Sequence, residues 1–336
     1  MKPQLEFPED PLQRFLTLAE AIATKKRWFH GWSMLRFAAL GLQTVPGDPV
    51  ELVERLERVV KELDDNFSWL SSIGKDLRFC LAAAILRHGG NGVEFAQTLG
   101  TARTWFREAK LSRSEIHEAL ATIVLIDASA DGRPTRDQVF RLAEVHQGMR
   151  RLSRFFTHTD DYPAAALLAQ RGDDLGTIEK RLGSLYENLR QLRFKSGNDL
   201  QLATHLLYFA DVEDQVIASR FHALYKAFAN EGLHMHRGDY DEIASLSLLD
   251  HDPSAIVQRV LSDRETLRER LRPKPSKQEG FTFASTTTFL TFAVRNRKLH
   301  IINDAVNLAQ VISLIQAQQA AAAVAASSAA ASAGAG

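Results

Sequence analysis

The residues of this chain best suited to chemistry are histidines that stand close to carboxylates in the sequence. In one such segment, His158 precedes Asp160 and Asp161. Histidine and carboxylate side chains together can bind zinc or iron, and they can also serve as acid and base in catalysis. The alternative is structural, because either aspartate can cap a helix that begins at Tyr162. We favour the cap and keep the metal or acid–base cluster as the alternative hypothesis.

A second segment places His234 and His236 shortly before Asp239. A further histidine lies between two aspartates at 250–252, where the second aspartate also fits as a helix cap. The sequence contains no His-x3-His pair, no HExxH motif and no pair of cysteines, which are the stronger signatures of a metal site. A divalent metal at these histidines and acids is therefore the only cofactor that the sequence suggests, and otherwise we expect none.

Motifs of the common enzyme classes are missing from the sequence. It contains no P-loop, no GxGxxG and no GxSxG. Cys80 lies in an apolar helical stretch, which predicts a buried and inert thiol. Arg150, Arg151 and Arg154 have helical spacing and could contact an acidic protein partner, although a plain exposed face is the simpler interpretation. We therefore lean towards a protein that is not an enzyme.

The composition is that of an ordinary globular protein: of 336 residues, 45% are apolar and 24% are charged. The 41 basic residues equal the 41 acidic ones, so bulk positive charge does not favour nucleic acid. A single cysteine excludes a disulfide scaffold. The first residues do not read as a secretion signal, and no long apolar stretch precedes the alanine-rich tail. We expect a cytoplasmic protein with neither nucleic-acid nor membrane partners.

Apolar residues recur with helical spacing almost everywhere, which predicts an all-α fold of about fifteen helices. Between Val50 and Leu63 they form one stripe, and Asp48 is expected to cap that helix with Pro49 as its first residue. The best candidate for a strand is 281–289, which is rich in threonine and phenylalanine, although its end is also spaced like a helix. We therefore predict no strand.

Self-comparison of the chain shows an internal repeat. The stretch that starts at Gly47 resembles the stretch that starts at Gly172, 125 residues later. Within these stretches, Gly-Lys-Asp-Leu at 74–77 matches Gly-Asn-Asp-Leu at 197–200. In both, we expect the glycine to end one helix and the aspartate to cap the next. The fold class predicted is therefore a duplicated multi-helix unit of about 125 residues.

Two arrangements of the predicted repeats remain open. They can stack into a solenoid-like body, which we prefer, or pack as two helical lobes with a cleft between them. The predicted segments are an N-terminal helical head at 1–30, a first repeat at 31–156, a second repeat at 157–272, a truncated third unit at 281–316 and an alanine-rich low-complexity tail at 317–336.

Two segments, Phe155–Leu168 and Ser196–Ala203, resemble an uncharacterised bacterial family, the domain of unknown function 4003. That family has a similar Leu-Thr-x-x-Asp-Asp-Tyr-Pro segment before a small-apolar helix, a similar Gly-Asn-x-Leu-Gln segment and an Ala- and Gln-rich C-terminus. The likeness covers roughly residues 15 to 320, with Phe156 where the family often has leucine. The resemblance implies a bacterial cytosolic protein and carries no assigned activity, so no catalytic residue can be transferred.

A shorter segment, Ala128–Thr135, is similar to the turn between helices of TerB-type tellurite-resistance domains, in which acidic residues bind metal. The acid expected a few residues later would be Asp137. Because Asp-Gly turns between helices are common, this likeness is weaker.

The repeat and the missing catalytic motifs favour a scaffold that presents a concave helical surface to a protein partner. The first alternative is a metal-binding protein or metal-dependent enzyme that uses the histidines and aspartates named above. The second alternative is a sensor with a small-ligand pocket between the repeats.

Overall fold

The structure is a computed structural model, and it describes residues 7–25, 31–67, 73–129, 131–152 and 157–295. These residues form fourteen α-helices and two short 3-10 helices, and no strand is found among them. The prediction of an all-α fold is confirmed. None of the described helices is both long and apolar enough to cross a membrane.

The chain divides into two compact units, and the described part of the first ends at Leu99. Helix α5 begins in this unit and ends in the second. The helices of the first unit are α1 (Pro11–Ala23), α2 (Trp32–Leu42), α3 (Pro49–Asn66), α4 (Lys75–Arg87) and the first part of α5 (Gly92–Glu108).

The second unit continues from Gly100 as a succession of helical hairpins. Its elements are α6 (Glu115–Ala128), α7 (Arg136–Leu152), η1 (Thr159–Asp161), α8 (Tyr162–Gln170), α9 (Leu175–Gln191), α10 (Asn198–Leu207), α11 (Asp214–Asn230), η2 (Arg237–Asp239), α12 (Tyr240–Ser247), α13 (Pro253–Arg270) and α14 (Lys277–Arg295).

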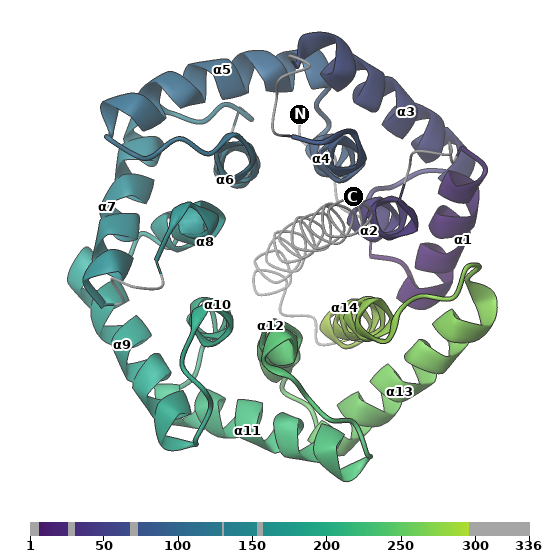
Figure 1. The fold of residues 1–336 in the computed structure, drawn as a ribbon, viewed down its shortest axis with the longest axis vertical. Helices are drawn as coiled ribbons and strands as arrows, with labels where there is room; N and C mark the ends of the chain where they lie inside the picture. The colour runs from purple at the N-terminus through teal and green to yellow at the C-terminus, as the bar shows by residue number, and fades with distance from the viewer. Residues whose placement is uncertain (1–6, 26–30, 68–72, 130, 153–156, 296–336) are drawn as a thin grey trace, which may run out of the picture. The chain divides into compact units, whose positions relative to one another are not determined.

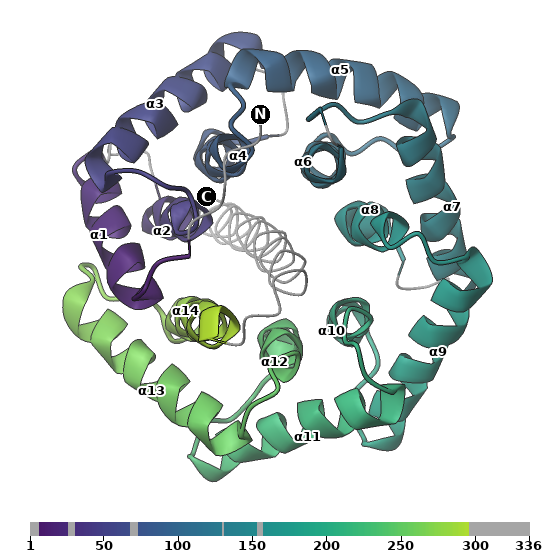
Figure 2. The same cartoon turned by 180° about the vertical axis from the view of Figure 1, so that it is seen from behind.

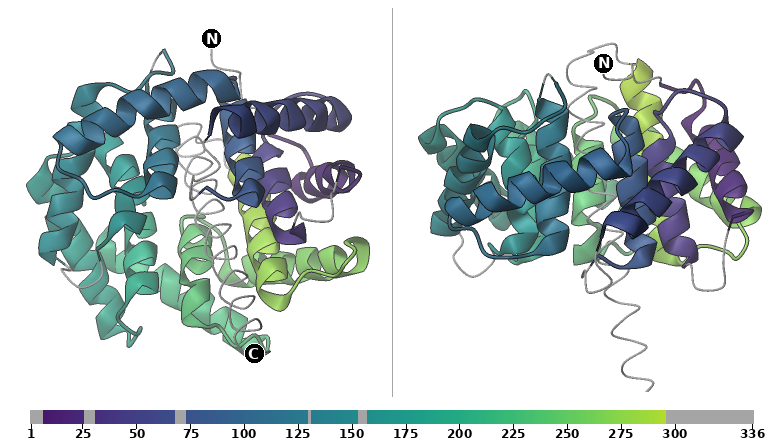
Figure 3. Two further views of the ribbon diagram at one scale, coloured as in Figure 1. Left: turned by 45° about the horizontal axis from the view of Figure 1, so that its top comes forward. Right: turned by 90° about the horizontal axis from the view of Figure 1, so that it is seen from above.

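Helices of the second unit alternate between two layers. The odd-numbered layer holds α7, α9, α11 and α13, and the even-numbered layer holds α6, α8, α10, α12 and α14 (Figures 1 and 2). Figure 1 looks along the axes of α8, α10 and α12 and across those of α7, α9 and α11, so the helices of a hairpin cross at a steep angle. Figure 3 shows the same alternation from two other directions. Neighbouring hairpins pack through both layers, as in the pairs α10·α12 and α9·α11.

Local sequence explains where several helices begin. The Asp48 carboxylate accepts hydrogen bonds from the N–H groups of Val50 (2.8 Å) and Glu51 (3.3 Å), with proline as the first helical residue. Asp252 caps α13 in the same way through the N–H of Ala255 at 3.0 Å. Both predicted caps are confirmed.

The predicted apolar stripe of α3 is also confirmed, since the side chains from Leu52 to Leu63 on that stripe are buried. Cys80 is a buried free thiol whose Sγ lies 3.5 Å from the carbonyl oxygen of Met34, as predicted.

The strand pattern at 281–289 was misleading, because this segment is part of helix α14. Its threonines satisfy their hydroxyl groups inside the helix: Thr286 donates to the carbonyl of Thr282 at 3.0 Å and Thr287 to that of Phe283 at 3.0 Å. Three phenylalanines of the segment are buried, so tertiary packing outweighs the β propensity of this composition. Gly280 also lies inside α14.

The glycines of the two matched Gly-x-Asp-Leu segments begin helices rather than end them. Gly74 is the N-cap of α4 and Gly197 the N-cap of α10. Gly197 has a φ of +145°, and a Cβ at this position would collide with the guanidinium of Arg237. The backbone conformation therefore favours glycine here, whereas the long Arg237 side chain could move aside for a Cβ. Asp199, expected to cap, lies in the first turn of α10 instead.

The described structure leaves the duplication and its five segment boundaries as predictions. The tail at 317–336 and the part of the third unit after residue 295 lie outside the described residues.

Candidate functional site

In the first predicted segment, the side chain of Asp161 binds the backbone of His158. The carboxylate Oδ2 of Asp161 accepts a hydrogen bond from the N–H of His158 at 3.0 Å and closes the 3-10 helix η1. Asp161 is also the N-cap residue of α8, but its side chain makes no capping bond to that helix. His158 and Asp160 are exposed. Asp161 thus has a structural role, but its carboxylate closes η1 and does not cap α8 as the sequence predicted.

Sequence reasoning missed the side chains that surround Asp161. His205 on α10 is buried, and its Nδ1 lies 3.8 Å from Oδ1 of Asp161, too far for a hydrogen bond. Gln201, one turn earlier on α10, donates from Nε2 to the hydroxyl of Thr157 at 2.9 Å and to Asp161 at 3.5 Å. On α7, the ring Nε2 of His146 donates to the carbonyl of His158 at 2.9 Å. A polar cluster therefore lies where α7, η1 and α10 meet.

Burial controls the protonation of this polar cluster. It raises the pKa of the Asp161 carboxyl to about 8, with repulsion from Asp160 adding to the shift. It lowers the pKa of the His205 imidazole to about 3, and the nearby His146 adds to that shift. Nδ1 of His205 and Oε1 of Gln201 make no hydrogen bond within the described structure. The cluster is thus best held with Asp161 protonated and His205 neutral.

The second predicted segment repeats the same local structure. The N–H of His236 donates to Oδ2 of Asp239 at 2.6 Å and closes the 3-10 helix η2 before α12. His234 and His236 are exposed, whereas Asp239 is buried. The pattern His-x-x-Asp-Tyr occurs at 158–162 and again at 236–240, and this repeated pattern could have predicted the shared turn.

The predicted metal ligands thus fall into two separate segments, one directly before α8 and one directly before α12. No group of three or more His, Cys, Asp or Glu residues in the described part of the chain is placed to hold a metal ion. The metal site stays a prediction.

Two further sequence features are the arginines at 150–154 and the segment similar to TerB-type domains. Arg151 pairs with Glu179 of α9, and Arg154 lies outside the described residues. In the segment similar to TerB-type domains, Asp131 accepts a hydrogen bond from the N–H of Arg133 at 3.0 Å and stabilises the turn between α6 and α7. Ala130 lies outside the described residues, and this likeness also stays a prediction.

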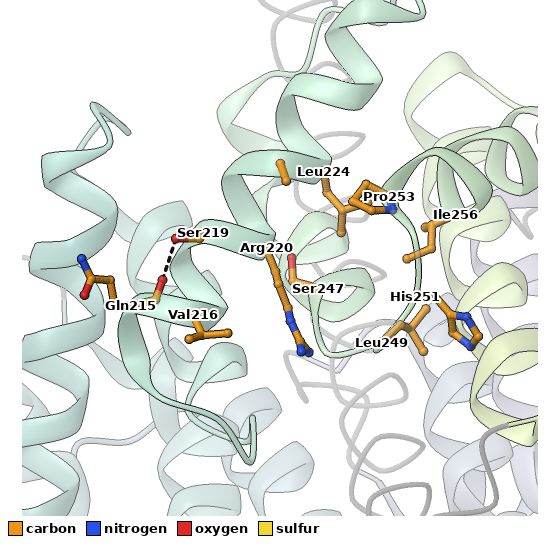
Figure 4. A pocket seen from close by; sticks show the side chains of 11 residues that line it. Gln215, Val216, Ser219, Arg220, Leu224, Ser247, Leu249, His251, Pro253 and Ile256 are labelled. Atoms are coloured by element: carbon orange, nitrogen blue, oxygen red, sulfur yellow. Dashed lines mark hydrogen bonds between the residues drawn. The ribbon is translucent and has the colours of Figure 1, made fainter.

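A groove of about 540 Å³ lies between α11 and α13, at the loop that follows α12 (Figure 4). Its mouth is open to solvent, and most of its wall is apolar. The apolar side chains that line it are Val216, Ala223, Leu224, Leu249, Pro253 and Ile256. The polar side chains that line it are Gln215, Ser219, Arg220, Ser247 and His251. We call it the α11–α13 groove.

A recurring arginine contact is incomplete at this groove. Arg141 of α7 donates to the carbonyl of Asp173, in the loop before α9, at 2.5 Å. Arg181 of α9 donates to the carbonyls of Ala210 (2.5 Å) and Val212 (3.1 Å), in the loop before α11. Each arginine thereby ties its helix to the start of the next hairpin.

Arg220 occupies the corresponding place on α11, but it makes no hydrogen bond to a backbone carbonyl of the loop before α13 within the described structure. Its Nη2 donates to Oδ1 of Asp250 at 2.8 Å, and the Asp250 side chain is 76% exposed. In Figure 4 the Arg220 side chain extends between Val216 and Ser247. Arg220 thus lines the groove, whereas Arg181 is bound to loop carbonyls one hairpin earlier.

His251 adds a second polar group to the wall of the α11–α13 groove. Its ring lies 4.7 Å from the ring of Phe292 on α14. Its Nε2 is buried and makes no hydrogen bond within the described part of the chain. Buried polar atoms are normally paired, so this nitrogen is suited to a buried water molecule.

Comparison with known proteins places the chain in a family. Residues 20–320 match the family described as "Protein of unknown function (DUF4003)". The chain belongs to this family, which confirms the resemblance seen in the sequence. A similar protein is the uncharacterized protein YeaA of Bacillus subtilis (strain 168), which is 23% identical over 262 residues, 77% of each chain. No solved structure matches.

The two segments that carried the resemblance meet in space. Thr157 and Asp161 come from the first segment and Gln201 from the second, and the hydrogen bonds of Gln201 join them. The residues by which the family was recognised therefore include part of a buried polar junction between α8 and α10.

Proposed function

We propose that the protein is an interaction scaffold without catalytic activity, and that the α11–α13 groove receives an apolar segment of a partner protein. The observation that carries this proposal is the groove itself: an open hollow of about 540 Å³ with six apolar side chains in its wall. Covering apolar surface contributes about 25 cal/mol per Å², so an apolar segment seated against this wall would be stabilised.

Val216 supports the groove as the place of contact. The large apolar side chains that are exposed in the described structure are Val50, Val93, Leu152 and Val216. Of these, Val216 lines the α11–α13 groove and is 45% exposed at its mouth. A helix or an extended segment that presents apolar side chains at regular spacing would cover it.

Site-specific photo-crosslinking in cells of the source organism tests this proposal. Val216 is replaced by p-benzoylphenylalanine, and Leu152 of α7, which is equally exposed, is replaced in a control. We expect the crosslinker at position 216 to join one apolar peptide of one partner, identified by mass spectrometry, and the crosslinker at 152 not to join it. Ser219→Trp, which fills the groove from its rim, should remove the product while circular dichroism shows an unchanged fold.

The proposal is overturned if position 216 yields no product beyond that of position 152, or if Ser219→Trp leaves the product unchanged in a folded protein. A small molecule in the groove, detected by native mass spectrometry and lost with Ser219→Trp, would replace the scaffold by a ligand sensor.

A further inference from the structure

We infer that the α11–α13 groove selects its partner through a carboxylate: the occupant is an amphipathic peptide segment whose apolar side chains fill the groove and whose Asp or Glu binds Arg220. This inference rests on the proposed function and adds the recognition chemistry to it.

Arg220 has hydrogen-bonding capacity that the chain does not use. A guanidinium carries five N–H donors in a planar fork that matches a carboxylate. The equivalent Arg181 is engaged by two loop carbonyls and by the carboxylate of Asp214 at 3.1 Å, and it also lies over the ring of Tyr208 at 5.2 Å. Arg220 makes one hydrogen bond in the described structure. Most of its donors are therefore left for another acceptor.

Asp250 is a partner that a ligand can displace. Its side chain is 76% exposed, and ion pairs at the surface contribute about 0–1 kcal/mol. A carboxylate that enters together with apolar side chains would bind Arg220 in a drier environment, where charge-assisted hydrogen bonds are stronger. Exchange of Asp250 for such a carboxylate therefore costs little and gains a better shielded pair.

The charge of the groove wall favours an acidic occupant. Arg220 is the lining residue with a formal charge at neutral pH, and no carboxylate is among the lining residues. A basic segment would bring like charge against Arg220, whose acidic partner Asp250 is largely exposed and is not among the lining residues.

The open mouth of the groove favours a peptide over a small molecule. Both Val216 and Ala223 of α11 line the groove and are exposed, so an occupant extends along the helix surface rather than being enclosed. Small-molecule sites usually bury most of the ligand surface, which this groove does not provide.

Charge reversal in the crosslinking assay tests the inference. The p-benzoylphenylalanine at position 216 is combined with Arg220→Glu, and in a matched control with Lys226→Glu, which reverses an exposed charge on the same helix outside the groove. We expect the crosslinked peptide to contain an Asp or Glu within about one helical turn of the crosslinked residue. We expect its yield to fall at least about tenfold with Arg220→Glu and less than about twofold with Lys226→Glu.

The other outcomes separate the two proposals. A product whose yield does not respond to Arg220→Glu, or whose peptide has no acidic residue, overturns the carboxylate inference and leaves the scaffold standing. The same holds if both reversals reduce the yield equally. Absence of any product specific to position 216 overturns both. Native mass spectrometry that shows a small carboxylate, lost with Arg220→Glu, overturns the peptide as occupant.

Discussion

Oδ1 of Asp161 and Nδ1 of His205 lie 3.8 Å apart at the junction of η1 and α10 and are not hydrogen-bonded to each other; His205 is buried and the Asp161 side chain is 13% exposed. In the unfolded chain the aspartate has its ordinary pKa of 3.8 and the histidine 6.5. Folding raises the pKa of Asp161 and lowers the pKa of His205, so the pair links stability to pH.

The signs of the two contributions can be worked out separately. The pKa of Asp161 is raised to about 8, so its contribution to stability is complete below pH 3.8 and is lost as the pH rises to 8. The pKa of His205 is lowered to about 3, so its contribution is present above pH 6.5 and is lost as the pH falls to 3. Between about pH 4 and 6.5 the two contributions to the slope of unfolding free energy against pH cancel. Above pH 6.5 only the loss from Asp161 remains.

The first prediction concerns Asp161→Asn. From pH 6.5 to 8 the wild-type protein should lose up to about 2 kcal/mol of unfolding free energy relative to this variant, which has no carboxyl to ionise. Urea unfolding at both pH values measures this difference. Asp137→Asn, an exposed aspartate on α7, is the control and should follow the wild type. Parallel pH profiles for Asp161→Asn and wild type would contradict the prediction.

The second prediction concerns two residues with left-handed backbone. Lys110 (φ +59°) and Arg193 (φ +68°) follow the ends of α5 and α9, where glycine avoids the strain of a Cβ. Lys110→Gly and Arg193→Gly should each raise the free energy of unfolding by about 0.5–1 kcal/mol. Lys61→Gly, in the middle of α3, should instead lower it by about 1 kcal/mol. Thermal unfolding of the three variants measures this, and a loss in all three would argue against the backbone explanation.

The third prediction compares the arginines of neighbouring hairpins. Arg181→Met leaves two loop carbonyls and Asp214 without their donor, so it should cost about 2–3 kcal/mol. Arg220→Met removes one exposed ion pair and should change stability by less than about 0.5 kcal/mol. Urea midpoints of both variants test this contrast. Equal losses would show that Arg220 is structural and would weaken its assignment to binding.

Much of the helical framework follows from local sequence. The stripe of α3 and the aspartate–proline starts of α3 and α13 depend on residues within a turn of each other, so spacing alone predicts them. The 281–289 segment misled because its β-branched and aromatic composition favours a strand in isolation. Its helix depends on packing with α13 and on the bond from Thr282 to Glu242 of α12 at 2.6 Å, which no local pattern contains.

The candidate sites were less predictable, for the same physical reason. The sequence offered Asp161 as a helix cap or a metal ligand, but His205 and Gln201 reach it from another hairpin. The α11–α13 groove combines α11, the loop after α12 and the start of α13, and its arginine looks like any surface charge in the sequence. Only the comparison of Arg220 with Arg181 shows that its donors are unused.

The central claim is that Arg220 binds an acidic residue of a partner, and charge-swap rescue tests it most directly. The partner peptide identified at Val216 is synthesised with its acidic residue and with lysine in its place, and fluorescence anisotropy gives the affinity of each for the wild type and for Arg220→Glu. We predict that Arg220→Glu weakens the acidic peptide at least about tenfold and that the lysine peptide restores affinity to within about threefold. If the lysine peptide binds Arg220→Glu no better than the acidic peptide does, Arg220 does not contact that residue and the claim is wrong.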